Sequence, residues 1–587
     1  METHADRLRS KYMAWVHELG ESRIGGKRLI DRLALGDGSS YWWMTLLVEQ
    51  NPWKSPSIGD AIRLLALEEV VAQHGSTRLT FVSADRRLHK VLERFSLDLG
   101  LAYEWDRIPG QAQAAKGVKG IYRALPQAVQ AVLSIARQLR GRWPLGRADK
   151  SGWFGGDAAV FFCSYFLHLD REAFAAGRFH SHQWENLPTL LHNRGYRANW
   201  LQHYLESSAV PGVDAAKELV RRFNLRRDEQ GFHSFVDAYL SWRVVLRASA
   251  RWFRLVALSS RLGAIRHAFR PAGSRFSMWP LLRGDWFASM RGPVAISNLL
   301  WIELFDEALR DLPHQPQGLF LCENHEWERA MILAWRKHGH GRLIGVVHST
   351  VRFWDLRYFT DPRTVRASDR HALPQADFIA LNGKAAVDAY LGVDFPQEAI
   401  VECEALRYLH LNELPAGRAI GSDRKNATRV LVLGDSEPRS TRSMLRLLEA
   451  AAPGIPAPVS YTVKPHPAVA VDATDYPSLN LEVVTAHLRE IMQDFDIAYS
   501  ANTTSAAVDA YFAGLPVVVM LDATELNYSP LRGRSGVQFV STPAELAAAL
   551  RPAPAAAQAS PDRRDFFFLD PELPRWKSLF AHAGVPG

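Results

Sequence analysis

The chain contains 587 residues, of which 47% are hydrophobic and 22% are charged. This is the composition of a globular protein, and the length is sufficient for two domains with insertions. The 70 basic residues exceed the 62 acidic residues by only +8. That modest excess, without a helix-turn-helix, zinc-ligand or RNA-binding signature, argues against a nucleic-acid-binding protein.

The cysteines and the lack of targeting signals indicate the compartment. Cys163, Cys322 and Cys403 are scattered, without the spacing of a disulfide framework or a metal site, which favours a reducing cytoplasm. The first residues are charged and lack the apolar core of a signal peptide, and no apolar run reaches the ~20 residues of a membrane span. We expect a cytoplasmic protein that is soluble or peripheral on the inner membrane.

Strand and helix patterns alternate along the first part of the chain, at the spacing of a doubly wound sheet. Strands are predicted at residues 28–35, 78–82, 158–166, 198–204, 318–322 and 342–348. Two helical segments, near residues 111–149 and 214–270, interrupt this pattern. The pattern predicts an amino-terminal Rossmann-like domain over residues 1–370 with two helical insertions.

A second series of apolar strands follows a connection rich in Pro, Arg and Asp. These strands are predicted at residues 377–381, 399–403, 428–434, 460–465, 496–500 and 516–520. They predict a second Rossmann-like domain over residues 371–550, followed at 551–587 by a Pro/Ala-rich linker and an apolar segment that docks back. Two such domains facing each other across a cleft form the α/β fold called GT-B. Ligands are then expected outside the carboxyl ends of the strands.

Residues with phosphate-binding chemistry follow three strands of the second domain. His466 in the segment KPHP can donate a hydrogen bond to a phosphate, and Lys464 can add positive charge. Hydroxyls at the start of the next helix suit an anion, although the same residue types are ordinary helix caps. Asp509 suits ribose hydroxyls, or is a solvated helix residue. The candidate nucleotide-binding residues are Gly434, Lys464, His466, Asn502, Thr503, Thr504, Ser505 and Asp509.

This HP dipeptide followed by a hydroxyl cluster resembles bacterial sialyltransferases and Kdo transferases, which use CMP-activated sugars. In those families the His and the Ser/Thr pair contact the CMP phosphate, which implies this role for His466, Thr503, Thr504 and Ser505. The wider chain resembles a family of bacterial surface-carbohydrate proteins of O-antigen or capsule biosynthesis. The matching segments include residues 36–56, 183–191 and 322–350.

Transfer of a sugar to a hydroxyl group requires a base near the attacking oxygen. Asp37 is one candidate, because it lies between glycines where sialyltransferases place an Asp/Glu-Gly motif, although Asp-Gly is also a common turn. Glu323, at a strand end before an acid-rich helix start, is an equal candidate, and His348 is a third base or a substrate ligand. Arg352, Arg357 and Arg407 lie in loops expected to face the cleft, where they suit a carboxylate-bearing sugar or a phosphate, or pair with nearby acids.

We therefore predict a metal-independent, inverting glycosyltransferase of surface-polysaccharide biosynthesis that needs no cofactor. His466 stabilises the departing phosphate, and Asp37 or Glu323 accepts the hydroxyl proton. The preferred donor is a CMP-ulosonic acid, and the acceptor is a lipid-linked glycan or an oligosaccharide. The alternatives are a CDP-glycerol-type polyol-phosphate transferase, a UDP- or GDP-sugar transferase, and a non-catalytic glycan-assembly subunit.

Residues 121–142 form a predicted amphipathic helix that carries several arginines and no acidic residue. Such a helix suits an anionic membrane surface. It equally suits packing of the apolar side on its own domain. The sequence leaves both alternatives open.

Overall fold

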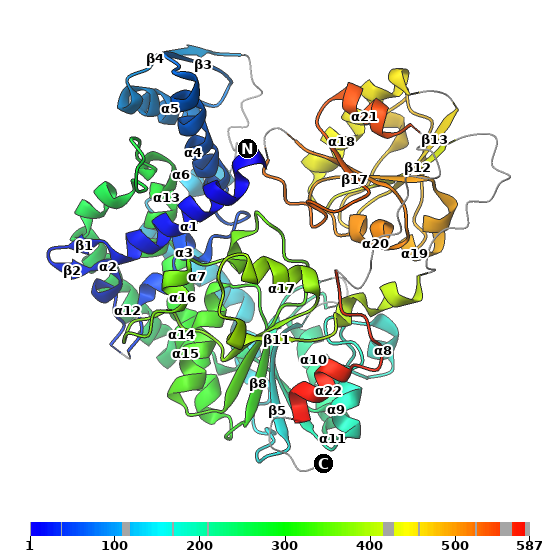
Figure 1. Ribbon diagram of the computed structural model, residues 1–587. Helices are drawn as coiled ribbons and strands as arrows, with labels where there is room; N and C mark the ends of the chain where they lie inside the picture. Colours follow the sequence, from blue (N-terminus) through cyan, green and yellow to red (C-terminus); the bar gives the residue numbers. More distant parts are fainter. Residues whose placement is uncertain are drawn as a thin grey trace.

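The structure is a computed structural model that describes residues 2–36, 38–108, 118–166, 169–207, 210–414, 428–455, 458–522, 525–551 and 566–581. Most strands form two large parallel sheets, each flanked by helices (Figure 1). The predicted α/β fold with two parallel-sheet units is therefore confirmed. Within the described residues, no helix combines the length and the apolar character that crossing a membrane requires.

The first sheet has seven parallel strands in the order β11-β10-β9-β8-β5-β6-β7. Their bounds are β5 Ala159–Phe166, β6 Arg197–Tyr204, β7 Phe232–Phe235, β8 Gln317–Leu321, β9 Arg342–Val346, β10 Phe378–Leu381 and β11 Ile400–Glu402. Side chains alternate between two cores: Phe161 packs with the helices on one face, whereas Phe162 packs with Trp200 on the other. Leu321 of β8 pairs with Val346 of β9, so the residues after both strands emerge at the same edge.

Two sequence-based strand assignments are corrected by this sheet. Strand β10 was expected to open the second sheet, but it pairs with β9 of the first sheet, and β11 follows beside it. A buried apolar strand carries no local signal of which sheet it joins, which explains the error. The region near 214–270 is also not purely helical, because β7 lies within it and pairs with β6.

The second sheet has six parallel strands in the order β14-β13-β12-β15-β16-β17. Their bounds are β12 Thr428–Leu433, β13 Val459–Lys464, β14 Leu481–Val483, β15 Ile497–Ser500, β16 Val517–Met520 and β17 Val537–Val540. Leu433 pairs with Lys464 on one side and with Ser500 on the other. The loops after β13, β12 and β15 therefore leave the sheet side by side.

The amino-terminal region is mainly helical, and one predicted strand there is wrong. Residues 28–35 contain helix α2 (Leu29–Arg32), whose Leu29 and Ile30 are buried in a helical core. A short apolar run fits one helical turn as well as a strand, which is why the pattern misled. Strand β3 (Arg78–Val82) is present, but it pairs with β4 (Ala102–Asp106) in a separate two-stranded sheet.

The helices fall into groups that Figure 1 shows around the sheets. The amino-terminal helices are α1 Ala5–Glu21, α2, α3 Leu46–Glu49, α4 Ser57–His74, α5 Arg86–Leu99, α6 Val118–Ala124 and α7 Gln127–Arg142. Those that follow within or beside the first sheet are α8 Arg171–Ala175, α9 Leu187–Asn193, α10 Val213–Asn224, α11 Arg227–Gln230, α12 Trp242–Ser260, α13 Trp279–Arg291, α14 Pro293–Asp311, α15 Glu326–Lys337, α16 Pro362–Val365 and α17 Lys384–Leu391. The second sheet carries α18 Pro438–Ala451, α19 Leu488–Ile491, α20 Ala506–Phe512 and α21 Pro543–Ala549, and the chain ends with α22 Pro574–Ala581.

The carboxyl-terminal segment contacts both parts of the molecule. Phe567 stacks on Phe512 of the second sheet's helix α20 and on Tyr408 of the connecting segment. Further along, Trp576 is fully buried in the core on one face of the first sheet and donates to the carbonyl of Glu404 at 3.0 Å. In Figure 1 this red segment runs from the connection between the sheets down to the first sheet. The segment thus packs against the second sheet's helix α20, the connecting segment and the first sheet.

Candidate active site

Two ionisable side chains meet at the carboxyl edge of the first sheet. Glu323 follows β8 and His348 follows β9, and the neighbouring strands bring Glu323 Oε1 to 3.5 Å from His348 Nε2. The other carboxylate oxygen of Glu323 lies 3.6 Å from Arg357 Nη1. Parallel strands thus bring this pair together at their carboxyl ends, where ligands are expected in such sheets.

A third side chain, His325, ties Glu323 to the amino-terminal helices. Its Nε2 lies 2.9 Å from Glu323 Oε2, and its Nδ1 lies 3.0 Å from Glu49 Oε1. Burial lowers the pKa of His325, but the bonds to the two carboxylates outweigh burial and raise it to about 9. His325 is therefore an imidazolium at neutral pH, so it positions Glu323 and cannot act as the base itself.

The carboxylates around His325 are held in the ionised state. Burial alone would raise the pKa of Glu323, but the hydrogen bond from His325 and the charges of His348 and Arg357 hold it well below its ordinary value. The pKa of Glu49 falls to about 2, because His325 and Lys54 outweigh the effect of its burial. Lys54 Nζ bridges Glu49 at 2.7 Å and Glu326 at 2.6 Å. The group is consequently an alternating array of charges in which each carboxylate faces a cation.

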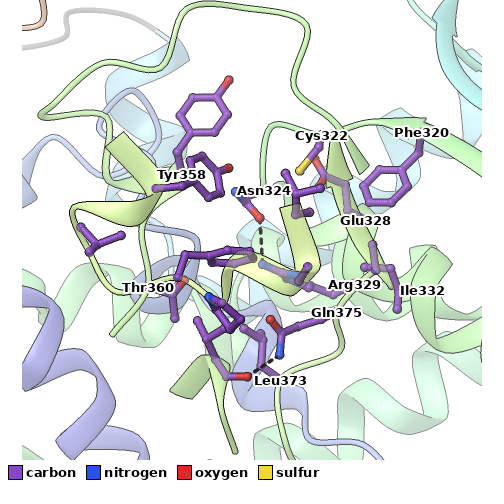
Figure 2. A pocket seen from close by; sticks show the side chains of 18 residues that line it. Phe320, Cys322, Asn324, Glu328, Arg329, Ile332, Tyr358, Thr360, Leu373 and Gln375 are labelled. Carbon is purple, nitrogen blue, oxygen red and sulfur yellow. Dashed lines mark hydrogen bonds between the residues drawn. The ribbon is translucent and has the colours of Figure 1, made fainter. Parts of the chain in front are cut away.

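The turn after β8 is shaped so that Glu323 points into this array. Asn324 adopts the left-handed region at φ 58°, which is uncommon for a residue other than glycine. Arg329 donates to Asn324 Oδ1 at 3.0 Å and to the carbonyl of Pro374 at 2.9 Å. Figure 2 shows the hydrogen bond between Arg329 and Asn324, and both residues line a cavity of about 180 Å³. Glu328 accepts from the amides of Glu323 and His325 at 2.8 and 3.0 Å, which fixes the start of α15.

Sequence reasoning missed Glu49, Lys54 and His325, although a signal for them existed. All three belong to the segments 36–56 and 322–350 on which the family resemblance rests. Glu49 and His325 are separated by 276 positions in the chain, and only the fold brings them together. Both segments resemble the same protein family and both carry charged residues, which could have suggested that they form one site.

A small cavity adjoins this charge array and is lined by two arginines that the sequence predicted to face the cleft. Arg352 and Arg357 line the cavity of about 340 Å³, together with Trp53, Ser349, Thr350, Asp355 and Tyr358. The guanidinium of Arg357 lies 4.8 Å from the centre of the Trp53 ring. Arg357 donates to Asp355 at 2.9 and 2.7 Å, so the cavity offers a ligand the guanidinium of Arg352 and an indole ring close to Glu323.

The second sheet gathers the predicted phosphate-binding residues at its carboxyl edge. The hydroxyl of Thr503 donates to the buried carboxylate of Asp435, which follows β12 and Gly434. A side chain at Gly434 would bring its Cβ to 3.1 Å from the amide nitrogen of His466, so glycine permits this close approach. His466 Nδ1 accepts from the amide of Ala468 at 3.1 Å. In the neutral ring that bond leaves the proton on Nε2, where it can be donated to a ligand.

The remaining predicted residues of the second sheet have structural partners. Lys464 Nζ donates to the carbonyl of Thr485 at 2.9 Å, and Thr504 accepts weakly from the amide of Ala506 at 3.4 Å. Asn502 Nδ2 donates to the carbonyl of Leu526 at 2.6 Å. Ser505 precedes α20 without capping it through its side chain.

Two other predictions lie elsewhere. Asp509 pairs with His410 at 3.3 Å, and Arg407 lines a different cavity together with His410, so neither joins the groups above. Asp37 lies outside the described residues. The strand that was predicted to present it is wrong, because helix α2 occupies that stretch.

The two edges are linked by a short chain of contacts. Asn502 holds the carbonyl of Leu526, and Tyr528, two residues further, packs against Trp53 with ring centroids 6.0 Å apart. Trp53 in turn lies beside Arg357, which faces Glu323. Contacts through residues 526–528 and Trp53 therefore connect the segment that carries the hydroxyl cluster of the second sheet with the charge array of the first.

The charge array makes a pH-dependent contribution to stability that can be tested with His325→Gln. A folded pKa of about 9, above the ordinary 6.5, means that the contribution is fully present below pH 6.5 and is lost as the pH rises toward 9. The shift corresponds to about 3 kcal/mol. Denaturant unfolding at pH 6.5 and 9.5 should show a larger decline for the wild type than for the variant. Equal declines would mean that His325 is not held as an imidazolium.

Comparisons with known proteins give a consistent but distant likeness. No family model matches the sequence, and no curated protein matches it. Among solved structures, the calicheamicin glycosyltransferase CalG4 aligns with 73% of this chain and 99% of its own, at 12% identity and a TM-score of 0.37. MurG of Acinetobacter baumannii aligns with 67% of this chain and 90% of its own, at 11% identity and a TM-score of 0.34. A glycosyltransferase from Rickettsia africae aligns with 73% and 99%, at 9% identity and a TM-score of 0.35.

Proposed function

We propose that this chain is an inverting glycosyltransferase of the GT-B type that uses a nucleotide-activated sugar. The observation that carries the proposal is the pairing of two strand-end groups: the partly buried carboxylate of Glu323 with cationic partners on one sheet, and His466 with the Thr503 hydroxyl on the other. Contacts through Trp53 and Tyr528 connect them. A transferase needs these two chemistries, one for the acceptor hydroxyl and one for the departing phosphate.

The proposed reaction is a single displacement. The acceptor oxygen forms a bond to the anomeric carbon, while the bond from that carbon to the phosphate oxygen breaks and the nucleotide leaves. Glu323 accepts the hydroxyl proton, and the Nε2–H of His466 and the hydroxyls of Thr504 and Ser505 donate to the departing phosphate. The hydroxyl of Thr503, which donates to Asp435, holds the start of this segment in place beside them. The low pKa of Glu323 makes it a weak base. A weak base suffices in an oxocarbenium-like transition state, because the attacking hydroxyl becomes acidic only as its bond forms.

For the donor we propose a CMP-ulosonic acid, and for the acceptor a glycan of a surface polysaccharide. An ulosonic acid carries a carboxylate beside its anomeric carbon. The guanidinium group of Arg352, in the cavity near Glu323, suits such a carboxylate, whereas that of Arg357 is already held by Asp355. Gly434 and Lys464 would line the nucleotide, whereas His348 would orient Glu323 or the acceptor. Asn502 and Asp509 would position neighbouring segments through their contacts with Leu526 and His410. Asp37 stays an alternative base.

A thermal-shift screen against CMP, CDP, UDP, GDP and ADP tests the donor class. A ligand that binds only the folded chain raises the melting temperature by mass action. Selective stabilisation by CMP, abolished in His466→Ala, supports the ulosonic-acid donor. Stabilisation by CDP favours the polyol-phosphate reaction, and UDP or GDP changes the sugar donor. No response to any nucleotide favours a non-catalytic glycan-assembly subunit.

We also propose that the enzyme works on the inner membrane surface through helices α7 and α12. The predicted helix at 121–142 is broken at Pro126 into α6 and α7, and α7 packs Ile135 and Leu139 on the core while Val132 is exposed. Trp242, Leu246 and Phe253 of α12 are 66%, 67% and 65% exposed. Neither helix contains an acidic residue, and both carry arginines, which suits anionic lipid.

Introducing negative charges on the exposed apolar side of α12 tests this membrane proposal. The double variant Leu246→Glu and Phe253→Glu should cosediment at least about tenfold less with phosphatidylglycerol vesicles, because it loses apolar insertion and adds repulsion. Leu97→Glu on α5 is the matched control, because Leu97 is 68% exposed on another helix. Equal cosedimentation of wild type and double variant would remove α12 from any membrane contact.

A further inference from the structure

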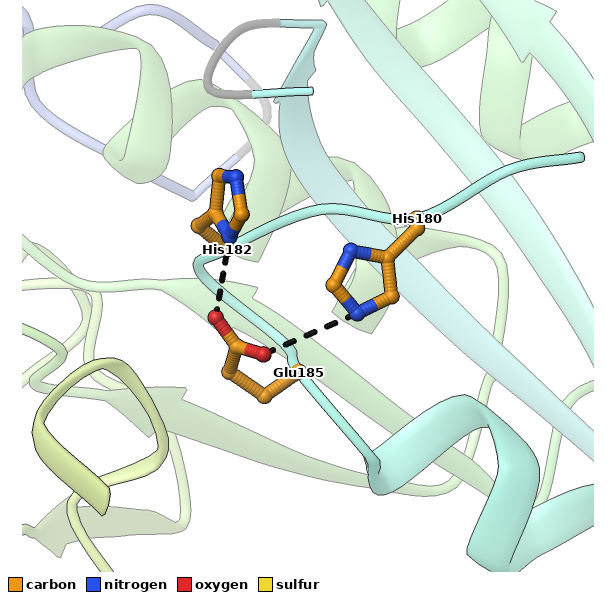
Figure 3. A group of neighbouring side chains, drawn as sticks. All are labelled: His180, His182 and Glu185. Atoms are coloured by element: carbon orange, nitrogen blue, oxygen red, sulfur yellow. Dashed lines mark hydrogen bonds and ion pairs between the residues drawn. The ribbon is translucent and has the colours of Figure 1, made fainter. Parts of the chain in front are cut away.

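A compact group of two histidines and a glutamate lies in the segment between β5 and α9, apart from the proposed reaction site. His180, His182 and Glu185 have ligand atoms that all lie within 4.8 Å of one another (Figure 3). The sequence analysis assigned no metal to the chain and did not single out these residues.

The segment that carries the three residues is firmly anchored. Ser181 bridges to Leu169, and its carbonyl accepts from the amides of Trp184 and Glu185 at 2.9 and 2.8 Å. Trp184 is fully buried and donates to Ser164 Oγ of β5 at 2.9 Å. Glu185 adopts a positive φ of 38°, a conformation that a non-glycine residue keeps only where its surroundings impose it. The backbone at Glu185 is therefore held in place by these contacts.

The spacing within the group matches a metal coordination sphere. His182 Nδ1 lies 3.1 Å from one carboxylate oxygen of Glu185, and His180 Nε2 lies 3.6 Å from the other. The second separation is too long for a hydrogen bond. Tetrahedral zinc with bonds of about 2.0–2.1 Å spaces its ligand atoms by roughly 3.3 Å. Both separations, which run to different oxygens of Glu185, lie close to that value, and all three ligand atoms lie within 4.8 Å of one another. Side-chain adjustments would therefore place one ion between the three residues.

The other group of this kind in the described residues differs in an important way. Glu49, His325 and Glu326 also have clustered ligand atoms, but Lys54 Nζ already lies 2.7 and 2.6 Å from the two carboxylates. An ammonium group therefore occupies the place of a cation there. At Glu185 the two carboxylate oxygens are directed at imidazole rings, which are metal ligands in their neutral form (Figure 3).

We infer that His180, His182 and Glu185 form a zinc site whose open coordination position faces an anion-binding cavity. Two imidazole nitrogens and one carboxylate oxygen are a ligand set typical of zinc with one position left for water or a ligand. His182 and Glu185 line a cavity of about 300 Å³ together with Arg407 and His410. A phosphate or carboxylate in that cavity would meet both the ion and the guanidinium of Arg407. This inference does not depend on the proposed sugar transfer.

Zinc uptake by the untagged full-length chain tests the site. After dialysis against EDTA and then buffer, calorimetry with zinc chloride should show one site per chain in the wild type. His180→Ala and His182→Ala should each weaken zinc binding at least tenfold. His192→Ala, which removes an exposed histidine of the adjacent helix α9, should bind as the wild type does. Cobalt(II) should give the intense visible absorption of a tetrahedral site in the wild type and lose it in both ligand variants.

Two outcomes would overturn the inference. One is a wild type that binds no zinc and gives no such cobalt spectrum. The other is unchanged zinc binding in the double variant of His180 and His182. Because both histidines are partly exposed, the variants should fold, and their metal-free melting temperatures check this. If the site is present, inorganic phosphate should bind more weakly to Arg407→Met than to the wild type when both are loaded with zinc.

Discussion

Replacing Glu323 by Gln is expected to lower the rate of sugar transfer by about 10²- to 10⁴-fold, the usual contribution of a general base. Glutamine keeps the shape of the side chain and can still meet His325, but it cannot accept a proton. The effect should appear in kcat, because the base acts in the transition state and not in donor binding. Initial rates of nucleotide release with donor and acceptor both present measure it.

Controls separate this role from a structural one. Glu482→Gln on the edge strand β14 alters an exposed carboxylate and should leave the rate unchanged. The melting temperature of Glu323→Gln reports any loss from the charge array around His325. Asp37→Asn tests the rival base: if it abolishes transfer while Glu323→Gln retains the wild-type rate, the hydroxyl proton goes to Asp37 and the assignment here is wrong.

Replacing His466 by Ala is expected to lower turnover by about 10²- to 10³-fold, the usual effect of removing one donor to a developing oxyanion. The Nε2–H of His466 would be lost, while within the described residues its ring accepts a hydrogen bond from the amide of Ala468, which stabilises little of the fold. Stability should therefore change by no more than about 0.5 kcal/mol. Single-turnover rates and denaturant unfolding measure the two quantities.

His487→Ala is the matched control for His466. This exposed histidine precedes α19 of the same sheet and makes no capping bond through its side chain. Its removal should leave turnover intact. A wild-type rate in His466→Ala would remove the imidazole from the reaction and leave the phosphate to the hydroxyl cluster, where Thr504→Ala would then be the decisive variant.

Most strands of the two large sheets were predicted from the sequence, and so were the strand ends that carry the candidate site residues. Continuous apolar runs such as residues 318–322 and 496–500 are typical of buried parallel strands, and the polar residues that follow such runs reach the carboxyl edges. Glu323 and His348 were predicted independently, and the register of β8 with β9 brings them together. The candidates His466 and Thr503 lie at the ends of β13 and β15, on either side of β12.

The predictions that were wrong or missing share a physical cause. In each case the structure or position of a residue depends on residues far away in the sequence. Strand β10 looks like any buried strand, and only its partner β9 determines its sheet. The run at 28–35 is helical because the surrounding amino-terminal helices bury Leu29 and Ile30. His325 acquires its role from Glu49, which lies 276 positions away. Arg407 was expected in the same cleft as Arg352, but it lines the cavity beside Glu185.

The central claim is that this chain transfers a sugar from a nucleotide donor, and acceptor-dependent nucleotide release tests it most directly. The full-length chain is incubated with CMP-, UDP- and GDP-activated sugars and a lipid-linked glycan extract, and free nucleotide is quantified by chromatography. We expect release from one donor, preferably a CMP-ulosonic acid, that requires the glycan and is lost in Glu323→Gln. Release from no donor, under conditions in which the folded chain also binds no nucleotide, would contradict it.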